Sequence, residues 1–205
     1  MYSKPFPDII KPLGRDLFFD LKNDRNAIYV TFDDGPHPEI TPWVMEQLAL
    51  FNAKATFFLV GENAETYPKI ALDLINAGHS VGNHSQNHLS GWKTDNASYF
   101  DNIALCKETV DTRLLRPPYG QITRSQAKHL KHEYDLIMWS DLSADFDPKY
   151  TADECVSFAT RKVKSGSIIV FHDSEKAWPR LKDALPKCLA YYAQHGFNME
   201  AIPYL

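Results

Sequence analysis

Short strand-like segments alternate with longer helix-like segments along most of the chain, and this alternation constrains the fold more than any other feature. Seven segments are predicted to be strands because they are short, apolar and rich in β-branched or aromatic residues. They are Ala27–Phe32, Ala55–Val60, Ser80–Asn83, Leu114–Arg116, Leu136–Ser140, Ser167–Phe171 and Asn198–Ile202. Helix-like stretches between them include residues 38–53, 67–78, 101–112 and 153–166. The alternation predicts βαβ units and a parallel α/β sheet, either a barrel short of one strand or an open doubly wound sheet.

The size and charge of the chain fit one globular domain and exclude some partners. Its 205 residues are 44% hydrophobic, which is enough to bury a substantial core. The formal net charge is -4 and no basic run occurs, so we expect no nucleic-acid partner. Nothing in the sequence indicates an oligomeric state.

The same sequence predicts a protein without a membrane span. No run of apolar residues approaches the length of a transmembrane helix, and the first 16 residues lack the apolar centre of a signal peptide. As written, the chain is expected to be cytoplasmic, and an exported form would require that a leader had been removed. Cys106, Cys155 and Cys188 are widely spaced, so we expect buried free thiols in a reducing compartment.

Reactive side chains stand at the carboxyl ends of five of the predicted strands. In chain order these positions hold Asp33 with Asp34, Asn83 with His84, Arg116, Asp145 after a short connection, and His172 with Asp173. In parallel α/β folds these strand ends gather on one face, where active sites lie. Scattered surface charge would not fall so regularly at strand ends, and the pattern therefore indicates an enzyme.

Two adjacent aspartates and two histidines suggest a metal site. A turn alone could explain the Asp-Gly-Pro sequence, but it needs only one of the aspartates. His84 and His88 are four residues apart, so both imidazoles would point the same way if the segment formed a helical turn. With Asp34 they make three ligands with open positions for one divalent ion, most readily Zn²⁺, with Co²⁺, Ni²⁺ or Fe²⁺ as alternatives. The turn after the pair leaves Asp33 free to act as a base.

A metal-assisted hydrolysis also needs groups that move protons and hold charge. We expect Asp33 to be the general base, Arg116 to orient it, and His172 to be the general acid. Asp145 would support protonated His172, and the backbone amide of Tyr119 would line an oxyanion hole. Most of these residues also have a plainer interpretation. His172 could simply end a strand, and Arg116 could form a surface ion pair. Asp145 and Tyr119 lie in loops rich in turn formers.

Taken together, these residues resemble the polysaccharide deacetylase family, the NodB homology domains of carbohydrate esterase family four. The motifs "TFDDGP", "HSQNH", "RPPYG" and "IVFHD" occur in the family's order at strand ends, and the resemblance covers about residues 27 to 202. It implies a single-domain distorted (β/α)7 barrel at 27–205 after an N-terminal extension at 1–26, and removal of N-acetyl groups from an acetylated carbohydrate by a metal-dependent enzyme. It also implies the base, acid and ligand roles given above.

One motif departs from the family pattern, which there reads Asp-x-x-Asp-Trp. Here "LSADF" places Leu142 at the first Asp and Phe146 at the Trp, and only Asp145 remains. The apolar wall near the acetyl group therefore differs. We expect Tyr119, Phe146, Trp139 and Ile169 to contact substrate; Trp92 and Trp178 are further candidates because aromatic faces suit sugars.

Three alternatives remain at this point. "GHSVG" (78–82) matches the nucleophile elbow of serine hydrolases, but Ser80 opens a predicted strand instead of following one. A catalytically inactive carbohydrate-binding homologue would share the fold without the activity. The same site could instead cleave acetyl esters, as on acetylated xylan, or small linear amides.

Overall fold

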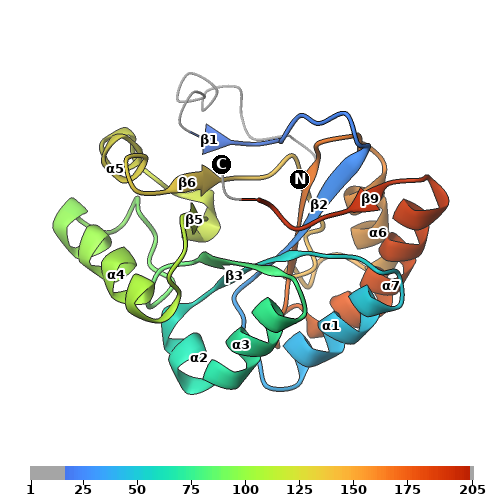
Figure 1. The fold of residues 1–205 in the computed structure, drawn as a ribbon, viewed down its shortest axis with the longest axis horizontal. Coiled ribbons are helices and arrows are strands. Elements are labelled where there is room, and N and C mark those ends of the chain that lie inside the picture. The colour runs from blue at the N-terminus through green and yellow to red at the C-terminus, as the bar shows by residue number, and fades with distance from the viewer. Residues whose placement is uncertain (1–16, 204–205) are drawn as a thin grey trace.

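A computed structural model describes residues 17–203, whose strands form one curled sheet in which every paired strand runs parallel (Figure 1). The strands are β1 (Leu17–Phe18), β2 (Ala27–Asp33), β3 (Thr56–Leu59), β4 (Ser80–Asn83), β5 (Leu114–Leu115), β6 (Asp135–Ile137), β7 (Asp141–Leu142), β8 (Ile168–His172) and β9 (Asn198–Met199). Their order is β1-β6-β5-β4-β3-β2-β8-β7, and β9 pairs with the start of β2.

The connection between β6 and β7 shows that the sheet is a barrel rather than an open sheet. These two strands lie near opposite ends of the strand order, six strand spacings apart, so in a flat sheet they would be about 29 Å apart. Only residues 138–140 join them, and the four residue steps from Ile137 to Asp141 reach at most about 14 Å. The predicted strand Leu136–Ser140 is therefore wrong as one unit, because the chain crosses from one edge of the curled sheet to the other within it.

Part of the expected N-terminal extension belongs to the sheet. Leu17 and Phe18 pair with Leu136 and Ile137, and Asp20 forms an isolated bridge with Ser167. A two-residue strand carries almost no periodic pattern, so β1 could not be predicted from the sequence. Residues 1–16 of the extension lie outside the described residues, and the division at residue 26 stays a prediction.

The helices cover the outside of the curled sheet (Figure 1). They are α1 (Ile40–Ala49), α2 (Gly61–Thr66), α3 (Pro68–Asn76), α4 (Asn96–Thr109), α5 (Arg124–Leu130), α6 (Ala152–Thr160) and α7 (Trp178–Gln194). Thr123 and Thr151 begin α5 and α6 with capping boxes, in which the threonine side chain and the third helical residue satisfy each other's backbone amides. Within residues 17–203, no helix has both the length and the apolar character needed to cross a membrane.

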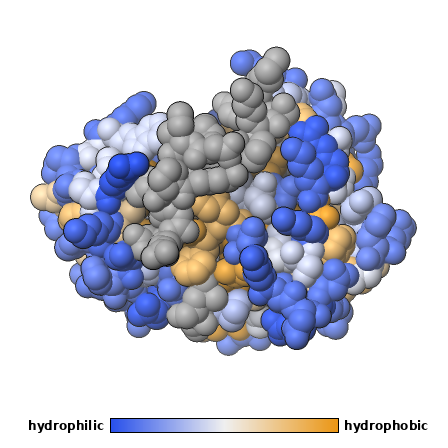
Figure 2. Space-filling model, turned by 90° about the horizontal axis from the view of Figure 1, so that it is seen from above, coloured by the Kyte–Doolittle hydropathy of each residue, from blue (hydrophilic) through white to orange (hydrophobic). Residues whose placement is uncertain are grey.

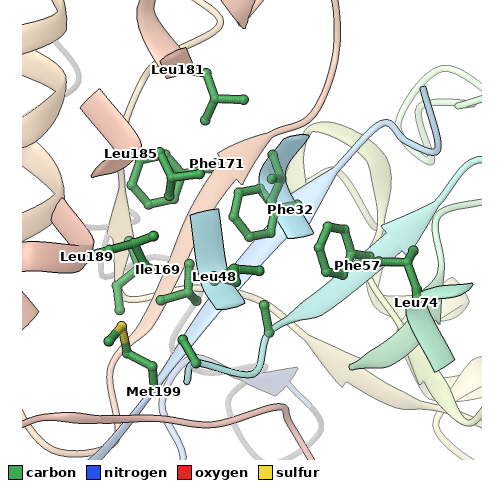
Figure 3. Packing of buried hydrophobic residues seen from close by; sticks show 14 of the residues in the cluster. Phe32, Leu48, Phe57, Leu74, Ile169, Phe171, Leu181, Leu185, Leu189 and Met199 are labelled. Atoms are coloured by element: carbon green, nitrogen blue, oxygen red, sulfur yellow. The ribbon is translucent and has the colours of Figure 1, made fainter. Parts of the chain in front are cut away.

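Alternation along the central strands separates the core from the site. On β2, Val30 and Phe32 point outward into a large cluster with α1 and α7, where Phe32 stacks on Phe57 at 4.9 Å between ring centroids (Figure 3). Tyr29 belongs to a second cluster inside the barrel. Asp33 is four residues further along β2, so it lies on the same face of the strand. The inner face of the strand thus changes from apolar to acidic at its carboxyl end.

The surface and the cysteines agree with this arrangement. Seen from above, hydrophilic residues lie mainly around the outer part of this face, and hydrophobic ones gather near its centre (Figure 2). Cys106, Cys155 and Cys188 are buried free thiols, as predicted.

Candidate active site

The acidic pair lies at the carboxyl end of β2, where the chain turns sharply. Asp33 ends the strand, Asp34 follows with a φ of 81°, and a cis peptide joins Gly35 to Pro36. The buried Asp173 holds this turn, because its Oδ1 accepts a hydrogen bond from the amide of Gly35 at 3.1 Å. A Cβ at Gly35 would lie 2.2 Å from Asp173 Oδ2, so the turn requires glycine.

The structure brings the three predicted metal ligands together. The ligand atoms of Asp34, His84 and His88 all lie within 4.8 Å of one another. Asp34 Oδ1 is 3.2 Å from His88 Nε2 and 3.9 Å from His84 Nε2. Burial alone would raise the pKa of Asp34, but the hydrogen bond from His88 and the charge of His172 hold it well below its usual value. This carboxylate is ionised at neutral pH, as a metal ligand must be.

The two histidines converge by a different route from the predicted one. Residues 84–88 form an irregular bend after β4 instead of a helical turn. Ser85 and His88 have φ values of 62° and 55°, and the amide of Ser85 donates to Asn83 Oδ1 at 2.8 Å. Left-handed backbone at these residues redirects the loop and turns both imidazoles toward Asp34.

Each histidine uses its second ring nitrogen in a way that suits metal binding. His84 Nδ1 is 2.7 Å from the carbonyl oxygen of Arg116, and His88 Nδ1 is 3.1 Å from the hydroxyl of Tyr119. A proton on Nδ1 leaves the lone pair of Nε2 for a metal ion. Burial lowers the pKa of His84 to about 4, which keeps that imidazole neutral. The residues present therefore fit a divalent metal.

Asp33 is paired with Arg116 as predicted, but the pair is buried and not on the surface. Arg116 is fully buried, and its Nη1 donates to Asp33 Oδ1 and to Thr31 Oγ1, both at 2.7 Å. The guanidinium also donates to the carbonyl oxygens of Ile137 and Met138 and lies 4.1 Å from the ring centroid of Phe58. Asp33 Oδ2 makes no hydrogen bond with residues 17–203, so it can accept a proton from a water molecule.

His172 and Asp145 form the second charged pair. Asp145 Oδ1 lies 2.8 Å from His172 Nδ1, and Asp145 Oδ2 accepts from the amide of His172 at 2.9 Å. Burial would lower the pKa of His172, but the charge of Asp145 and the hydrogen bond to it outweigh burial and raise the pKa to about 9. His172 is therefore protonated at neutral pH, with Nε2 available to donate.

The altered motif forms one wall beside this pair. Leu142 lines the cavity, and the ring of Phe146 packs edge-on against His172 at 4.9 Å between centroids. Asp141, one residue out of step with the family pattern, instead accepts hydrogen bonds from Ser140 and Ser167 at 2.7 and 3.1 Å. Asp145 alone supports the histidine, while Asp141 ties β7 to the start of β8.

One cavity of about 830 Å³ joins these groups, and it contains most but not all of the expected substrate residues. Tyr119, Phe146 and Trp139 line it. Ile169 lies in the outer core cluster, and its neighbour on β8, Val170, lines the cavity instead. Successive residues of a strand point to opposite faces, so the position next to the predicted one faces the site.

The other two tryptophan candidates lie elsewhere. Trp178 packs against Trp43 at 5.0 Å between ring centroids, at the edge of the core. Trp92 is 58% exposed and donates to the carbonyl oxygen of Ile122, and it is not among the described residues that line the cavity.

Two residues that hold Asp34 were not predicted. Asn63 on α2 donates to the backbone oxygen of Asp34 at 2.9 Å, and Ser174 lies 3.4 Å from its Oδ2. Ser174 directly follows the His-Asp motif, so its position was a usable signal. Asn63 follows the predicted strand Ala55–Val60, which does not end in a charged or metal-ligating residue, so the sequence offered no signal for Asn63.

The serine-hydrolase alternative lacks its structural context. Ser80 is the first residue of β4, and its hydroxyl donates to the carbonyl oxygen of Ile202 at 2.9 Å. A nucleophile elbow needs its serine on a sharp turn after a strand, exposed to substrate.

Comparison with known proteins identifies the family. The polysaccharide deacetylase family model matches residues 20–135, which are more than half of the chain. A peptidoglycan-N-acetylglucosamine deacetylase of Bacillus cereus is 32% identical over 88% of this chain and 68% of its own length. A chitooligosaccharide deacetylase of Azorhizobium caulinodans is 32% identical over 75% of this chain and 76% of its own length.

A solved structure agrees with the sequence comparisons. A crystal structure of a peptidoglycan N-acetylglucosamine deacetylase superposes with a TM-score of 0.86 at 29% identity, covering 93% of this chain and 94% of that one. The barrel predicted from the resemblance is thus confirmed by the strand topology and by this neighbour. The chain belongs to the polysaccharide deacetylase family.

Proposed function

We propose that this protein is a metal-dependent hydrolase that removes N-acetyl groups from N-acetylglucosamine-containing poly- or oligosaccharides of the peptidoglycan or chitin type. The observation that carries the proposal is one cavity in which the ligand cluster Asp34, His84 and His88 lies beside two proton-transfer groups, Asp33 and His172. The names of the relatives, peptidoglycan and chitooligosaccharide deacetylases, support this substrate class.

The three ligands would hold one divalent ion, zinc in the first place, with cobalt, nickel or iron(II) fitting the same atoms. Such an ion polarises a carbonyl and lowers the pKa of bound water. The left-handed backbone of Asp34 and His88 and the hydrogen bonds to Nδ1 of both histidines hold the ligands in place before any ion arrives. This preorganisation is the chain's own contribution to metal binding.

Asp33 is suited to remove a proton from the attacking water. Arg116 and the strand position fix its carboxylate, and Oδ2 is the oxygen left for water. The Arg116 side chain is itself fixed by Thr31 and two backbone carbonyls, so the base does not have to reorganise during the reaction.

His172 is suited to protonate the leaving amine. Its imidazolium is maintained by Asp145, and the His172 side chain lines the cavity next to Phe146. Hydrolysis of an amide needs this proton because an unprotonated amine is a poor leaving group. The acetyl methyl would lie against the apolar wall that Leu142, Phe146 and Val170 provide, and the amide of Tyr119 would face the developing oxyanion.

Acetate release tests the proposal directly. The purified protein is incubated with N-acetylglucosamine oligomers, after chelator treatment and again after zinc is restored. Release that stops with the chelator and returns with zinc is expected. Acetate from acetylated xylan but none from the oligomers would instead identify an ester hydrolase on the same site. Absence of acetate from both, together with retained binding of the oligomers, would identify an inactive carbohydrate-binding homologue.

A further inference from the structure

The cavity extends beyond the catalytic groups to a positively charged flank. Arg161 and Lys162, directly after α6, and Lys176, just before α7, all line it. We call these three residues the basic flank. All three are exposed, so they do not serve the core.

The cations of the basic flank have no acidic partner in the described part of the chain. Within residues 17–203, none of the three side chains forms an ion pair or a hydrogen bond. Instead, the guanidinium of Arg161 lies 5.3 Å from the ring centroid of Phe158, and the ammonium of Lys176 lies 5.5 Å from that of Phe146. Both rings also line the cavity, so the charges border an aromatic surface and remain able to bind an anion.

Lys176 is fixed relative to the catalytic acid. The Phe146 ring beneath its ammonium also packs against His172. Arg180 donates to the backbone oxygen of Lys176 and to that of Asp145, which joins the lysine's backbone to the support of His172. Since His172 would protonate the amine that stays on the sugar, the glycan itself must pass this side of the cavity.

The opposite side of the cavity has a different charge. Glu62 and Asn63 of α2 line it there, and Glu62 accepts a hydrogen bond from Asn87 at 2.6 Å. The strand order places β3, which leads into α2, and β8 on opposite sides of β2. A glycan in the cavity therefore meets positive charge on one side of the metal ligands only.

We propose that the basic flank recognises a carboxylate carried by the glycan, on the deacetylated sugar or on its neighbour, and so makes the enzyme selective for acidic over neutral N-acetylated glycans. This inference rests on the proposed function. Three cations that line one cavity attract an anion more strongly than a single exposed cation does. This attraction weakens as the salt concentration rises, because salt screens the charges. Phe146 and Phe158 provide the apolar surface for the part of the substituent that carries the charge.

The test compares two substrates that differ only in charge. One is the disaccharide of N-acetylglucosamine and N-acetylmuramic acid with its lactyl carboxylate free, and the other is its methyl ester. At low salt, kcat/KM is expected to be about tenfold higher for the free acid, mainly through KM, because partly exposed ion pairs each contribute modestly to binding. The ratio should fall toward one at about 0.5 M salt.

Charge-neutral variants locate the effect. In the triple variant Arg161→Gln, Lys162→Gln, Lys176→Gln the acid-to-ester ratio is expected to fall to about one. Lys182→Gln, an exposed lysine on α7 outside the cavity, is the matched control and should keep the wild-type ratio. A disaccharide that carries a short peptide distinguishes the two sources of carboxylate, because a preference for it alone would assign the recognised charge to the peptide.

The outcomes also separate this inference from the proposed function. No preference in the wild type for either the acid or the peptide-bearing disaccharide over the ester, or a preference unchanged in the triple variant, would overturn the role of the basic flank while leaving deacetylation established. If no substrate releases acetate, the proposed function fails. Calorimetric binding of the acid and the ester to Asp33→Asn then decides whether the basic flank still prefers the carboxylate.

Discussion

At the scale of single residues, the chemistry depends on how Asp145 tunes His172. A buried histidine without a charged partner would lose its proton more readily, yet Asp145 contacts both the ring and the amide of His172. The resulting pKa of about 9 suits an acid that must carry a proton at neutral pH. Because the protonated form is the active one, activity is present below this pKa and is lost as pH rises through it.

We predict that Asp145→Asn moves the alkaline limit of activity to lower pH. The amide oxygen of Asn can still accept from His172 Nδ1, but the negative charge is gone and burial then dominates. The limb of kcat/KM near pH 9 should shift down by about 1–3 pH units, the usual effect of one close charge. Asp147→Asn, outside the cavity, is the control. An unchanged pH profile in Asp145→Asn would show that Asp145 has only a structural role.

The sequence predicted that Asp173 lies at the site but indicated no role for it. Its carboxyl group accepts from the amide of Gly35 and from the hydroxyl of Thr41, and its own amide donates to the backbone oxygen of Asp33 at 3.2 Å. Burial raises the pKa of Asp173 to about 8, although the hydrogen bond from Thr41 opposes this rise. It therefore acts as a hydrogen-bonding brace between α1, β8 and the acidic turn.

We predict that Asp173→Ala lowers the free energy of unfolding by about 1–3 kcal/mol, because it leaves buried donors on Gly35 and Thr41 without acceptors. Acetate release should fall as well, since the turn that carries Asp33 and Asp34 loses its support. Asp173→Asn keeps an acceptor of the same shape and should lose much less of both. Urea unfolding measures the difference, and equal stability of the alanine variant and the wild type would contradict the role of the brace.

At the scale of elements, the sequence predicted which strands carry chemistry but not how the segments after them turn. Apolar runs are local signals, so β2, β4 and β8 and the reactive residues at their ends were predicted correctly. The bend that carries His84 and His88 depends on left-handed residues without glycine, and no periodic pattern reveals it. Likewise, nothing local shows that β6 ends at Ile137 and that residues 138–140 of the same apolar segment form the connection to β7.

Leu142 on β7 occupies the position of the family pattern's first aspartate, and this difference allows a prediction. Leu142→Asp restores the family's first aspartate, but Asp145 already accepts hydrogen bonds from both the amide and Nδ1 of His172. We expect no gain in kcat/KM on N-acetylglucosamine oligomers, because the new carboxylate would meet the apolar wall and not the acid. Leu142→Asn, of similar size without charge, serves as the control. A large gain in the aspartate variant alone would show that the altered motif limits catalysis.

At the scale of the whole molecule, the alternation of elements predicted a parallel α/β sheet, whereas barrel closure followed only from the resemblance. Closure is a long-range property: it depends on β6 and β7 lying near opposite ends of the strand order, which spacing along the chain does not encode. The same limit applies to Arg116, which reaches from the end of β5 across the barrel interior to Asp33 on β2. Contacts across the barrel require the fold before they can be stated, so the sequence could name Arg116 but not its buried network.

The ligand cluster joins segments far apart in the sequence, so metal binding should stabilise the whole fold. Ligands from the ends of β2 and β4 converge only in the native state, and an ion that binds that state alone raises its stability. At zinc about 100 times above its dissociation constant, the melting temperature should rise by about 5–10 °C. Asp34→Asn tolerates the left-handed backbone but lacks the charge, and most of this rise should vanish.

Asp33→Asn provides the matched comparison, since it changes the neighbouring carboxylate in the same way. It should keep the zinc-dependent rise in melting temperature and lose acetate release, because the ligands remain while the base is gone. A rise retained in Asp34→Asn and lost in Asp33→Asn would mean that the two aspartates exchange roles. The pair of variants therefore separates metal binding from proton transfer at adjacent positions of one turn.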